Sequence, residues 1–252
     1  MREQNFAASH YGARADAYVQ SQVHASGVDL DEMEVFLAES HHHSVLDLGC
    51  GGGHVSYRAA KHAGRVVAYD VTPTMLDAVA RTAAEKGLAN IETRLGAAEA
   101  LPFDAGSFDA VLCRFTAHHW SDFAAGLREA RRVIQPGCSA VFIDTIAPAR
   151  RVLDSHLQAM ELLRDPSHVR NYTSAEWFGA LSEAGFAVQR CTVRRLRMEF
   201  ASWIKRTGTP VDTAHAILRL QQGAPDSVKQ YFGIAPEGDF DLEAATIMVK
   251  AI

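Results

Sequence analysis

The amino-acid sequence predicts a doubly wound α/β protein with a mostly parallel, seven-stranded sheet, helices on both faces and a helical cap. Three observations predict this fold class. Short apolar strands alternate with segments of helical periodicity between residues 44 and 144, as in βαβ units. The first of these strands runs into a glycine-rich turn. The chain has 252 residues, 48% of them hydrophobic, which is enough for one large domain with a buried core.

Helical spacing marks the first forty residues of the chain. Apolar side chains recur at Tyr11, Tyr18 and Val19, and again at Met33 and Leu37. A glycine at position 27 separates the two groups, so we expect two short helices in residues 1–40.

The central part of the chain supplies the parallel strands. We predict strands at residues 44–48, 65–70, 90–95, 108–113 and 139–144. Two helices between them are predicted at residues 73–86 and 122–134. Pro73 fits the first turn of its helix and Gly87 the end, while Pro136 and Gly137 indicate a turn before the fifth strand.

After residue 145 the alternation loosens. Helices are predicted at residues 151–163 and 175–184, a long strand at 186–200, a broken helical stretch at 201–235 and a last strand at 242–249. No linker precedes this half, so we expect residues 1–252 to form a single domain. Its parts would be N-terminal helices (1–40), a cofactor-binding core (44–144) and sheet completion plus a cap over an acceptor site (145–252).

Composition argues against several function classes. The net charge of −5 gives no general attraction to nucleic acid or anionic lipid, and the arginines between residues 190 and 197 fit a solvated strand face. No apolar run is long enough for a membrane span. Four cysteines without metal-ligand or disulfide spacing indicate reduced thiols and a cytoplasmic protein. We expect no metal site, since His41, His42 and His43 alternate in direction along a strand.

The informative motif is the glycine-rich turn after the first strand. Asp47, Gly49, Gly51 and Gly53 follow a D-x-G-x-G-x-G spacing, and Asp70 ends the next strand about twenty residues later. Glycines let the backbone approach a ligand, and a carboxylate there accepts hydrogen bonds from both ribose hydroxyls. An NAD-dependent oxidoreductase is the alternative, but the G-x-G-x-x-G pattern of dinucleotide-binding proteins is not met, since His54 stands where the third glycine would be, and this argues against it.

Further motifs carry a family resemblance. They lie in residues 45–53, 67–75, 96–111 and 127–137, and include Leu101-Pro102-Phe103, Ser107-Phe108-Asp109 and the Arg132-to-Gly137 turn. Over about residues 44–144, the chain resembles the class I S-adenosylmethionine-dependent methyltransferases, and among them the ubiquinone/menaquinone-biosynthesis family. The resemblance implies a Rossmann-like fold, S-adenosylmethionine as cofactor and a small-molecule acceptor. No nucleic-acid or membrane partner is expected.

The resemblance also implies roles for individual residues. Gly49 and Gly51 would hold the methionine part of the cofactor, with Asp47 fixing the turn and Asp70 binding the ribose. The remaining implied cofactor contacts are Tyr18 on the N-terminal helix, Val71 and Met75 at the adenine face, Ala97, Ala98 and Glu99 at the adenine edge, and Arg114 at the methionine carboxylate. Relatives often have Asp where Ala97 stands, so we do not expect that side-chain contact here.

A general base is expected after the fourth strand. His118 and His119 follow that strand in a loop beside the methyl donor, and histidine has a suitable pKa. Asp144, at the end of the fifth strand, is a second candidate. Two alternatives stay open: packing roles for both histidines, and a non-catalytic S-adenosylmethionine-binding module, because the resemblance implies no universal catalytic side chain.

Overall fold

The computed structural model describes residues 27–39 and 42–252. The first predicted N-terminal helix, with Tyr11 and Tyr18, lies outside this part of the chain. The second is present as α4 (Val28–Ala38), which buries Leu30, Met33 and Leu37 against the sheet.

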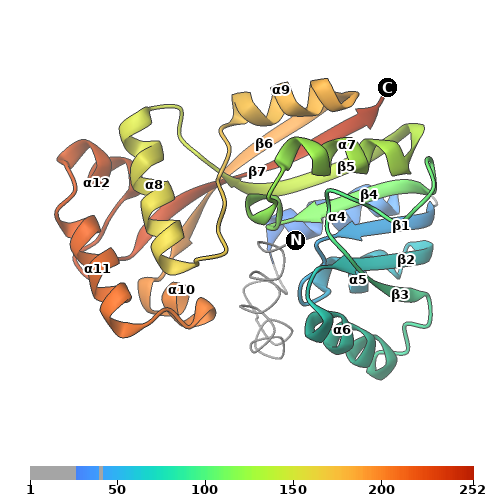
Figure 1. Ribbon diagram of the computed structural model, residues 1–252, viewed down its shortest axis with the longest axis horizontal. Coiled ribbons are helices and arrows are strands. Elements are labelled where there is room, and N and C mark those ends of the chain that lie inside the picture. The colour runs from blue at the N-terminus through green and yellow to red at the C-terminus, as the bar shows by residue number, and fades with distance from the viewer. Residues whose placement is uncertain (1–26, 40–41) are drawn as a thin grey trace.

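A seven-stranded sheet forms the centre of the molecule (Figure 1), and its strand order is β3-β2-β1-β4-β5-β7-β6. Strands β1 to β5 pair in parallel, whereas β7 runs antiparallel to both of its neighbours. The predicted mostly parallel, doubly wound sheet is therefore confirmed. The strands are β1 (His42–Leu48), β2 (Ala63–Asp70), β3 (Ile91–Leu95), β4 (Phe108–Arg114), β5 (Ile134–Ile146), β6 (Phe186–Met198) and β7 (Phe240–Ala251).

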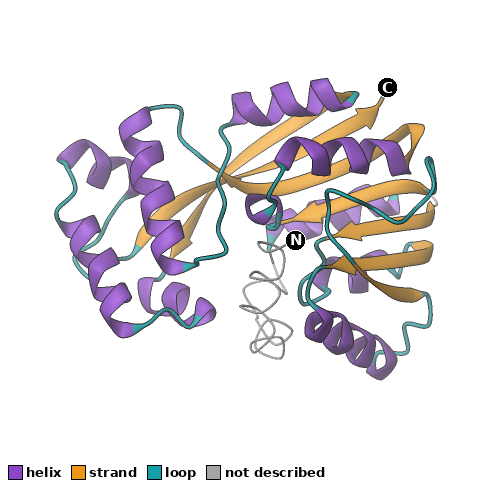
Figure 2. Ribbon diagram, viewed as in Figure 1, coloured by secondary structure: helices purple, strands orange, loops and turns teal. Residues whose placement is uncertain are grey.

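Helices cover both faces of this sheet (Figure 2). On one face, α4, α5 (His54–Ala59) and α6 (Pro73–Glu85) pack over residues such as Val45 and Val66. On the other face, α7 (Phe123–Val133) and α9 (Ser174–Ala184) pack over Leu46 and Val67. Adjacent residues of one strand are thus buried on opposite faces, which explains why the central strands read as continuous apolar runs.

Strand β5 begins earlier than the sequence predicts. The turn expected at Pro136 and Gly137 is a bulge inside the strand, where pairing with β4 shifts from Phe108↔Ile134 to Ala110↔Ser139. Gly137 has a φ of 80°, a left-handed conformation that suits glycine. The strand therefore gains five residues before position 139, and α7 ends at Val133.

The cap stands on an extension of the last two strands (Figure 1). Beyond the end of β5, Leu196 to Met198 of β6 pair with Leu242 to Phe240 of β7 as a two-stranded ribbon. Around it pack α8 (Arg151–Arg164), α10 (Phe200–Thr207), α11 (Val211–Gln222) and α12 (Asp226–Phe232). These helices enclose their own apolar cluster, with Trp203, Phe232 and Phe240 at its centre. The predicted long strand ends at Met198, and its last residue, Phe200, starts α10 instead.

Strand β6 forms one edge of the sheet. Arg190, Arg194, Arg195 and Arg197 lie along it, and Arg195 and Arg197 both contact Asp241 of β7. None of the helices in the described part of the chain is long and apolar enough to cross a membrane.

Candidate active site

A cavity of about 960 Å³ lies between the carboxyl ends of the parallel strands and the cap. Its sheet side is formed by residues at the ends of β1, β2, β4 and β5, including Gly49, Asp70, Arg114 and Thr145. Its cap side is formed by residues of α8, α10 and the β6–β7 ribbon. Ligands of open α/β sheets bind at this edge, so the position alone indicates a binding site.

The glycine turn forms one wall of the cavity. Backbone amides of Gly49 and Cys50 both donate to the Tyr69 carbonyl, at 2.8 and 3.0 Å, which ties the turn to β2. Gly49 has a φ of 76°, and a Cβ there would lie 2.3 Å from the Thr116 hydroxyl. Gly51 has a φ of 47°, and a Cβ there would meet no atom within 4 Å. Gly49 is therefore required for packing, whereas Gly51 leaves space in the cavity wall.

Asp70 connects this turn to the end of β2. One carboxylate oxygen accepts from the Gly51 amide at 2.9 Å and the other from the Thr72 amide at 2.9 Å. Burial raises the pKa of Asp70, and these amide donors oppose the increase. The carboxylate is thus fixed in orientation at the cavity wall.

Asp47 lies beneath the turn and is 1% exposed. Its Oδ2 accepts from the Ser56 hydroxyl at 2.5 Å, so the carboxyl links β1 to α5. Burial raises the pKa of Asp47 to about 7, and the nearby Asp70 carboxylate adds to the increase. Asp47 is therefore a much weaker acid than an exposed aspartate.

Arg114, predicted to meet the methionine carboxylate, lines the cavity but already has an acidic partner. Its Nε donates to Asp29 Oδ2 at 2.6 Å, and its side chain is only 7% exposed. Asp29 lies in the first turn of α4, which is thereby fastened to the end of β4. The sequence gives no signal for this pair, because the two residues are 85 positions apart.

Most of the residues that the resemblance assigns to adenine lie in the cavity wall. Val71, Met75, Ala98 and Glu99 line the cavity together. Glu99 Oε1 also accepts from the Ser121 and Asp122 amides, and so holds the turn before α7. Ala97, within the described chain, is not part of the wall; its carbonyl accepts from the Tyr69 hydroxyl at 3.2 Å. Tyr18 lies outside the described residues.

His118 is part of a short 3-10 helix, η1 (Ala117–His119). This helix begins directly after Thr116, in the loop that follows β4. Its Nδ1 lies 2.6 Å from Asp144 Oδ1, and its backbone amide donates to Oδ2 of the same carboxylate. Burial by itself lowers the pKa of His118, but the Asp144 carboxylate outweighs it and the pKa is raised. Because the Asp144 carboxylate accepts a hydrogen bond from Nδ1–H, Nε2 is the atom that accepts a proton when the ring is neutral.

His119 and His168 complete a cluster of imidazoles around His118. The ring centroids of His118 and His119 are 4.1 Å apart, and those of His118 and His168 are 5.6 Å apart. Burial, with His118 adding to it, lowers the pKa of His119 to about 4 and that of His168 to about 2. His119 Nδ1 lies 3.1 Å from the Ser167 carbonyl. His119 and His168 are therefore neutral side chains that pack, whereas His118 is able to exchange a proton.

Sequence reasoning missed two features of the site. Thr116, which fills the space beside Gly49, was not singled out, and neither was the grouping of His168 with His118. Both depend on chain segments that meet only in the folded protein. Within residues 27–39 and 42–252, no three His, Cys, Asp or Glu side chains are grouped so as to hold a metal ion.

Comparisons with known proteins identify the family. A model of the methyltransferase domain matches residues 46–142. The uncharacterised methyltransferase YcgJ of Bacillus subtilis is 35% identical over 224 residues, which cover 89% of this chain and 88% of that protein. The crystal structure of YcgJ superposes with a TM-score of 0.85 over 88% of this chain and 97% of that one, at 34% identity. The chain belongs to the class I methyltransferases.

Two further proteins are similar to this chain. The uncharacterised protein YafE of Escherichia coli is 42% identical over 203 residues, or 81% of this chain and 97% of YafE. A demethylmenaquinone methyltransferase of Chlorobaculum tepidum is 38% identical over 110 residues, which are 43% of each chain. The family membership favours methyl transfer over the oxidoreductase alternative.

Proposed function

We propose that this methyltransferase uses S-adenosylmethionine and methylates a small organic acceptor held beneath the cap. The observation that carries the proposal is the convergence of three features on one cavity. These are the open Gly51 position, the fixed Asp70 carboxylate and the His118–Asp144 pair. The demethylmenaquinone methyltransferase among the relatives supports an acceptor of small-molecule size.

The residues of the wall fit the cofactor. The methionine part would lie against Gly49 and Gly51, and at Gly51 the absence of a Cβ leaves space for it. Asp70 would accept from the ribose hydroxyls, and Met75 and Val71 would pack on the adenine. The buried carboxyl of Asp47 supports the turn from below. Arg114 would reach the methionine carboxylate only by sharing its guanidinium with Asp29.

The bound cofactor supplies an electrophilic methyl group on a sulfonium sulfur. The chain holds the acceptor in line with that methyl group, and positioning of this kind lowers barriers by up to about 7–11 kcal/mol. His118 Nε2 takes the acceptor's proton, and Asp144 stabilises the resulting imidazolium. His119, the other predicted base, supports His118 by packing, because its lowered pKa of about 4 makes it a weak base.

Calorimetric titration with S-adenosylhomocysteine tests the cofactor. We expect micromolar binding to the wild type, no binding of NADH, and about 10- to 100-fold weaker binding of S-adenosylhomocysteine to Asp70→Asn, which loses hydrogen bonds to a charged acceptor. Asp77→Asn is the matched control, because Asp77 is exposed on α6. NADH binding without S-adenosylhomocysteine binding would contradict the proposal.

The non-catalytic alternative has a separate test. Detection of any methylated product from a pool of small-molecule acceptors, with loss of product in His118→Gln, supports catalysis. Tight cofactor binding without product from any acceptor would favour a binding module.

A further inference from the structure

His168 lines the cavity beside His118, and one of its two ring nitrogens is already bonded. Its Nε2 lies 3.0 Å from Oε1 of Gln158, which belongs to α8. Its Nδ1 has no hydrogen-bond partner among the described residues. The buried atoms that lack a partner in this part of the chain include a nitrogen of His156 but none of His168. We therefore take Nδ1 to be accessible from the cavity that His168 lines.

The side-chain amide of Gln158 determines which nitrogen of His168 carries the proton. Its Nε2 donates to Asp154 Oδ1 and to the Asn171 carbonyl, both at 2.8 Å, which occupies both of its N–H groups. Its Oε1 accepts from the Asn171 amide at 3.0 Å and also faces His168 Nε2. Because an amide oxygen only accepts hydrogen bonds, His168 Nε2 is the protonated nitrogen and Nδ1 carries a lone pair.

The His168 ring stays neutral near neutral pH. Burial, with His118 and His119 adding to it, lowers the pKa of His168 to about 2. Nδ1 therefore accepts hydrogen bonds and does not donate them. His118 Nε2 is also an accepting nitrogen when that ring is neutral, because Asp144 holds Nδ1–H. Two neighbouring imidazoles of the cavity, with centroids 5.6 Å apart, thus each have one accepting nitrogen.

The loop between α8 and α9 fixes the position of His168 relative to His118. The amides of Val169 and Arg170 both donate to the His118 carbonyl, at 2.9 and 3.1 Å. On the other side, the Gln158 amide holds the loop to α8. A ligand that binds both rings therefore has little conformational entropy of the protein to overcome.

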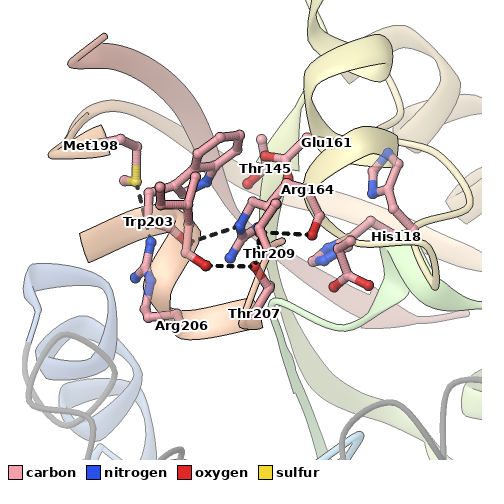
Figure 3. A network of polar contacts seen from close by, with 12 residues as sticks. His118, Thr145, Glu161, Arg164, Met198, Trp203, Arg206, Thr207 and Thr209 are labelled. Atoms are coloured by element: carbon pink, nitrogen blue, oxygen red, sulfur yellow. Dashed lines mark hydrogen bonds and ion pairs between the residues drawn. The ribbon is translucent and has the colours of Figure 1, made fainter. Parts of the chain in front are cut away.

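The cap wall beside His118 is held by a polar network of its own (Figure 3). Arg164 donates to Glu161 at 3.0 Å and to the Trp203 carbonyl at 3.2 Å. The Thr209 hydroxyl donates to the Arg164 carbonyl at 3.1 Å. Apolar residues of this wall are Leu196, Met198, Trp203 and Leu242. A molecule in this part of the cavity therefore has apolar surface for its body and the two histidines for one polar edge.

We infer that His168 determines specificity: the methyl acceptor carries a second hydrogen-bond donor, O–H or N–H, next to the group that is methylated, and His168 Nδ1 accepts from it. This inference rests on the proposed function, since it concerns the methyl acceptor of the same site. The substrate class is that of ortho-dihydroxy and ortho-amino-hydroxy compounds. A site of this kind rejects analogues without the second donor, because the accepting nitrogen would lose its water and gain no partner.

Nitrogen NMR of the histidine side chains tests the state of His168 without any ligand. The signals lost in His168→Asn identify the residue. We expect a protonated Nε2 and an unprotonated Nδ1 near neutral pH. A proton on Nδ1 would overturn the inference, because that atom would then be unable to accept.

Calorimetry with three matched probes tests the recognition. Naphthalene-2,3-diol, 3-amino-2-naphthol and 2-naphthol share one body and one hydroxyl and differ in the second donor. We expect at least one of the first two to bind the S-adenosylhomocysteine-saturated protein at least about tenfold tighter than 2-naphthol. The tighter of them identifies O–H or N–H as the donor. Equal affinities of the three probes, or no binding of the two with a second donor, would overturn the inference in the wild type alone.

A substitution that keeps the shape of the ring locates the preference. His168→Phe should remove the preference for a second donor, whereas packing alone would weaken all three probes alike. His215→Phe, the same change at an exposed position of α11, is the matched control and should keep the preference. A preference that survives His168→Phe would refute the role of His168. Titrations repeated without S-adenosylhomocysteine keep the two proposals separate, because a failure of cofactor binding contradicts the proposed function and leaves the probe preference measurable.

Discussion

His118 and Asp144 lie at the ends of the neighbouring strands β4 and β5, and their contact controls the pKa of the His118 imidazole. The Asp144 carboxylate, 2.6 Å from Nδ1, raises the pKa of His118 against the effect of burial. In Asp144→Asn the effect of burial is opposed only by the smaller contributions of Glu161 and Asp165, so we expect the pKa of His118 to fall.

NMR titration of the histidine Cε1 carbons measures this change. The resonance lost in His118→Gln identifies His118, and its midpoint should lie above that of a free histidine in the wild type. His215, exposed on α11, serves as an internal reference in the same spectra and should not move. An unchanged His118 midpoint in Asp144→Asn would show that Asp144 does not control the proton.

At the scale of elements, glycine has two separate roles in the turn after β1: it adopts a left-handed backbone conformation, and it leaves space for a ligand in the cavity wall. Gly51 and Gly87 both have positive φ, 47° and 68°, and a Cβ would meet no atom within 4 Å at either. Gly51→Ala and Gly87→Ala should therefore cost similar stability, about 1–2 kcal/mol each, as left-handed alanines do. Only Gly51→Ala should weaken S-adenosylhomocysteine binding, by tenfold or more, because only Gly51 lines the cavity. Thermal unfolding and calorimetry on both variants measure the two effects, and equal loss of binding in both would refute a specific role for Gly51.

The same scale shows what the sequence could predict. Strands β1, β2 and β4 and the spacing from Gly49 to Asp70 are local patterns, and their positions agree with the structure. The bulge at Gly137 was not predicted, because proline followed by glycine is equally typical of a turn between elements. The Asp29–Arg114 pair and the approach of His168 to His118 could not be predicted, since they depend on the packing of distant segments.

At the scale of the whole molecule, the imidazole cluster makes stability depend on pH. Burial keeps His119 and His168 neutral, with pKa values of about 4 and about 2. Below about pH 6.5 these two histidines bind protons in the unfolded chain but not in the folded protein. The free energy of unfolding therefore falls as the pH decreases from about 6.5 to 4. His118 acts in the opposite sense: its raised pKa contributes stability that is fully present below pH 6.5 and is lost as pH rises through that pKa.

Below about pH 6.5 the contribution of His118 to the free energy of unfolding is constant, whereas the contributions of His119 and His168 fall with pH. Acidification should therefore destabilise the protein. We expect the slope of unfolding free energy against pH between 6.5 and 4 to decrease in His168→Asn by up to about 1.4 kcal/mol per pH unit. His215→Asn is the matched control and should keep the wild-type slope. Denaturant titrations at several pH values give these slopes, and identical slopes in all three proteins would rule out the cluster as the cause.

Strand β6 lies at the edge of the sheet, and a sheet edge carries backbone amides and carbonyls that another chain is able to pair with. Its row of arginines has a consequence for behaviour at high concentration. If a second copy of the chain paired with this edge, Arg190, Arg195 and Arg197 of the two copies would approach one another. Their positive charges would repel, and their guanidinium groups would lose bound water. We expect Arg195 and Arg197, which contact Asp241, also to disfavour the pairing of a second chain along this edge.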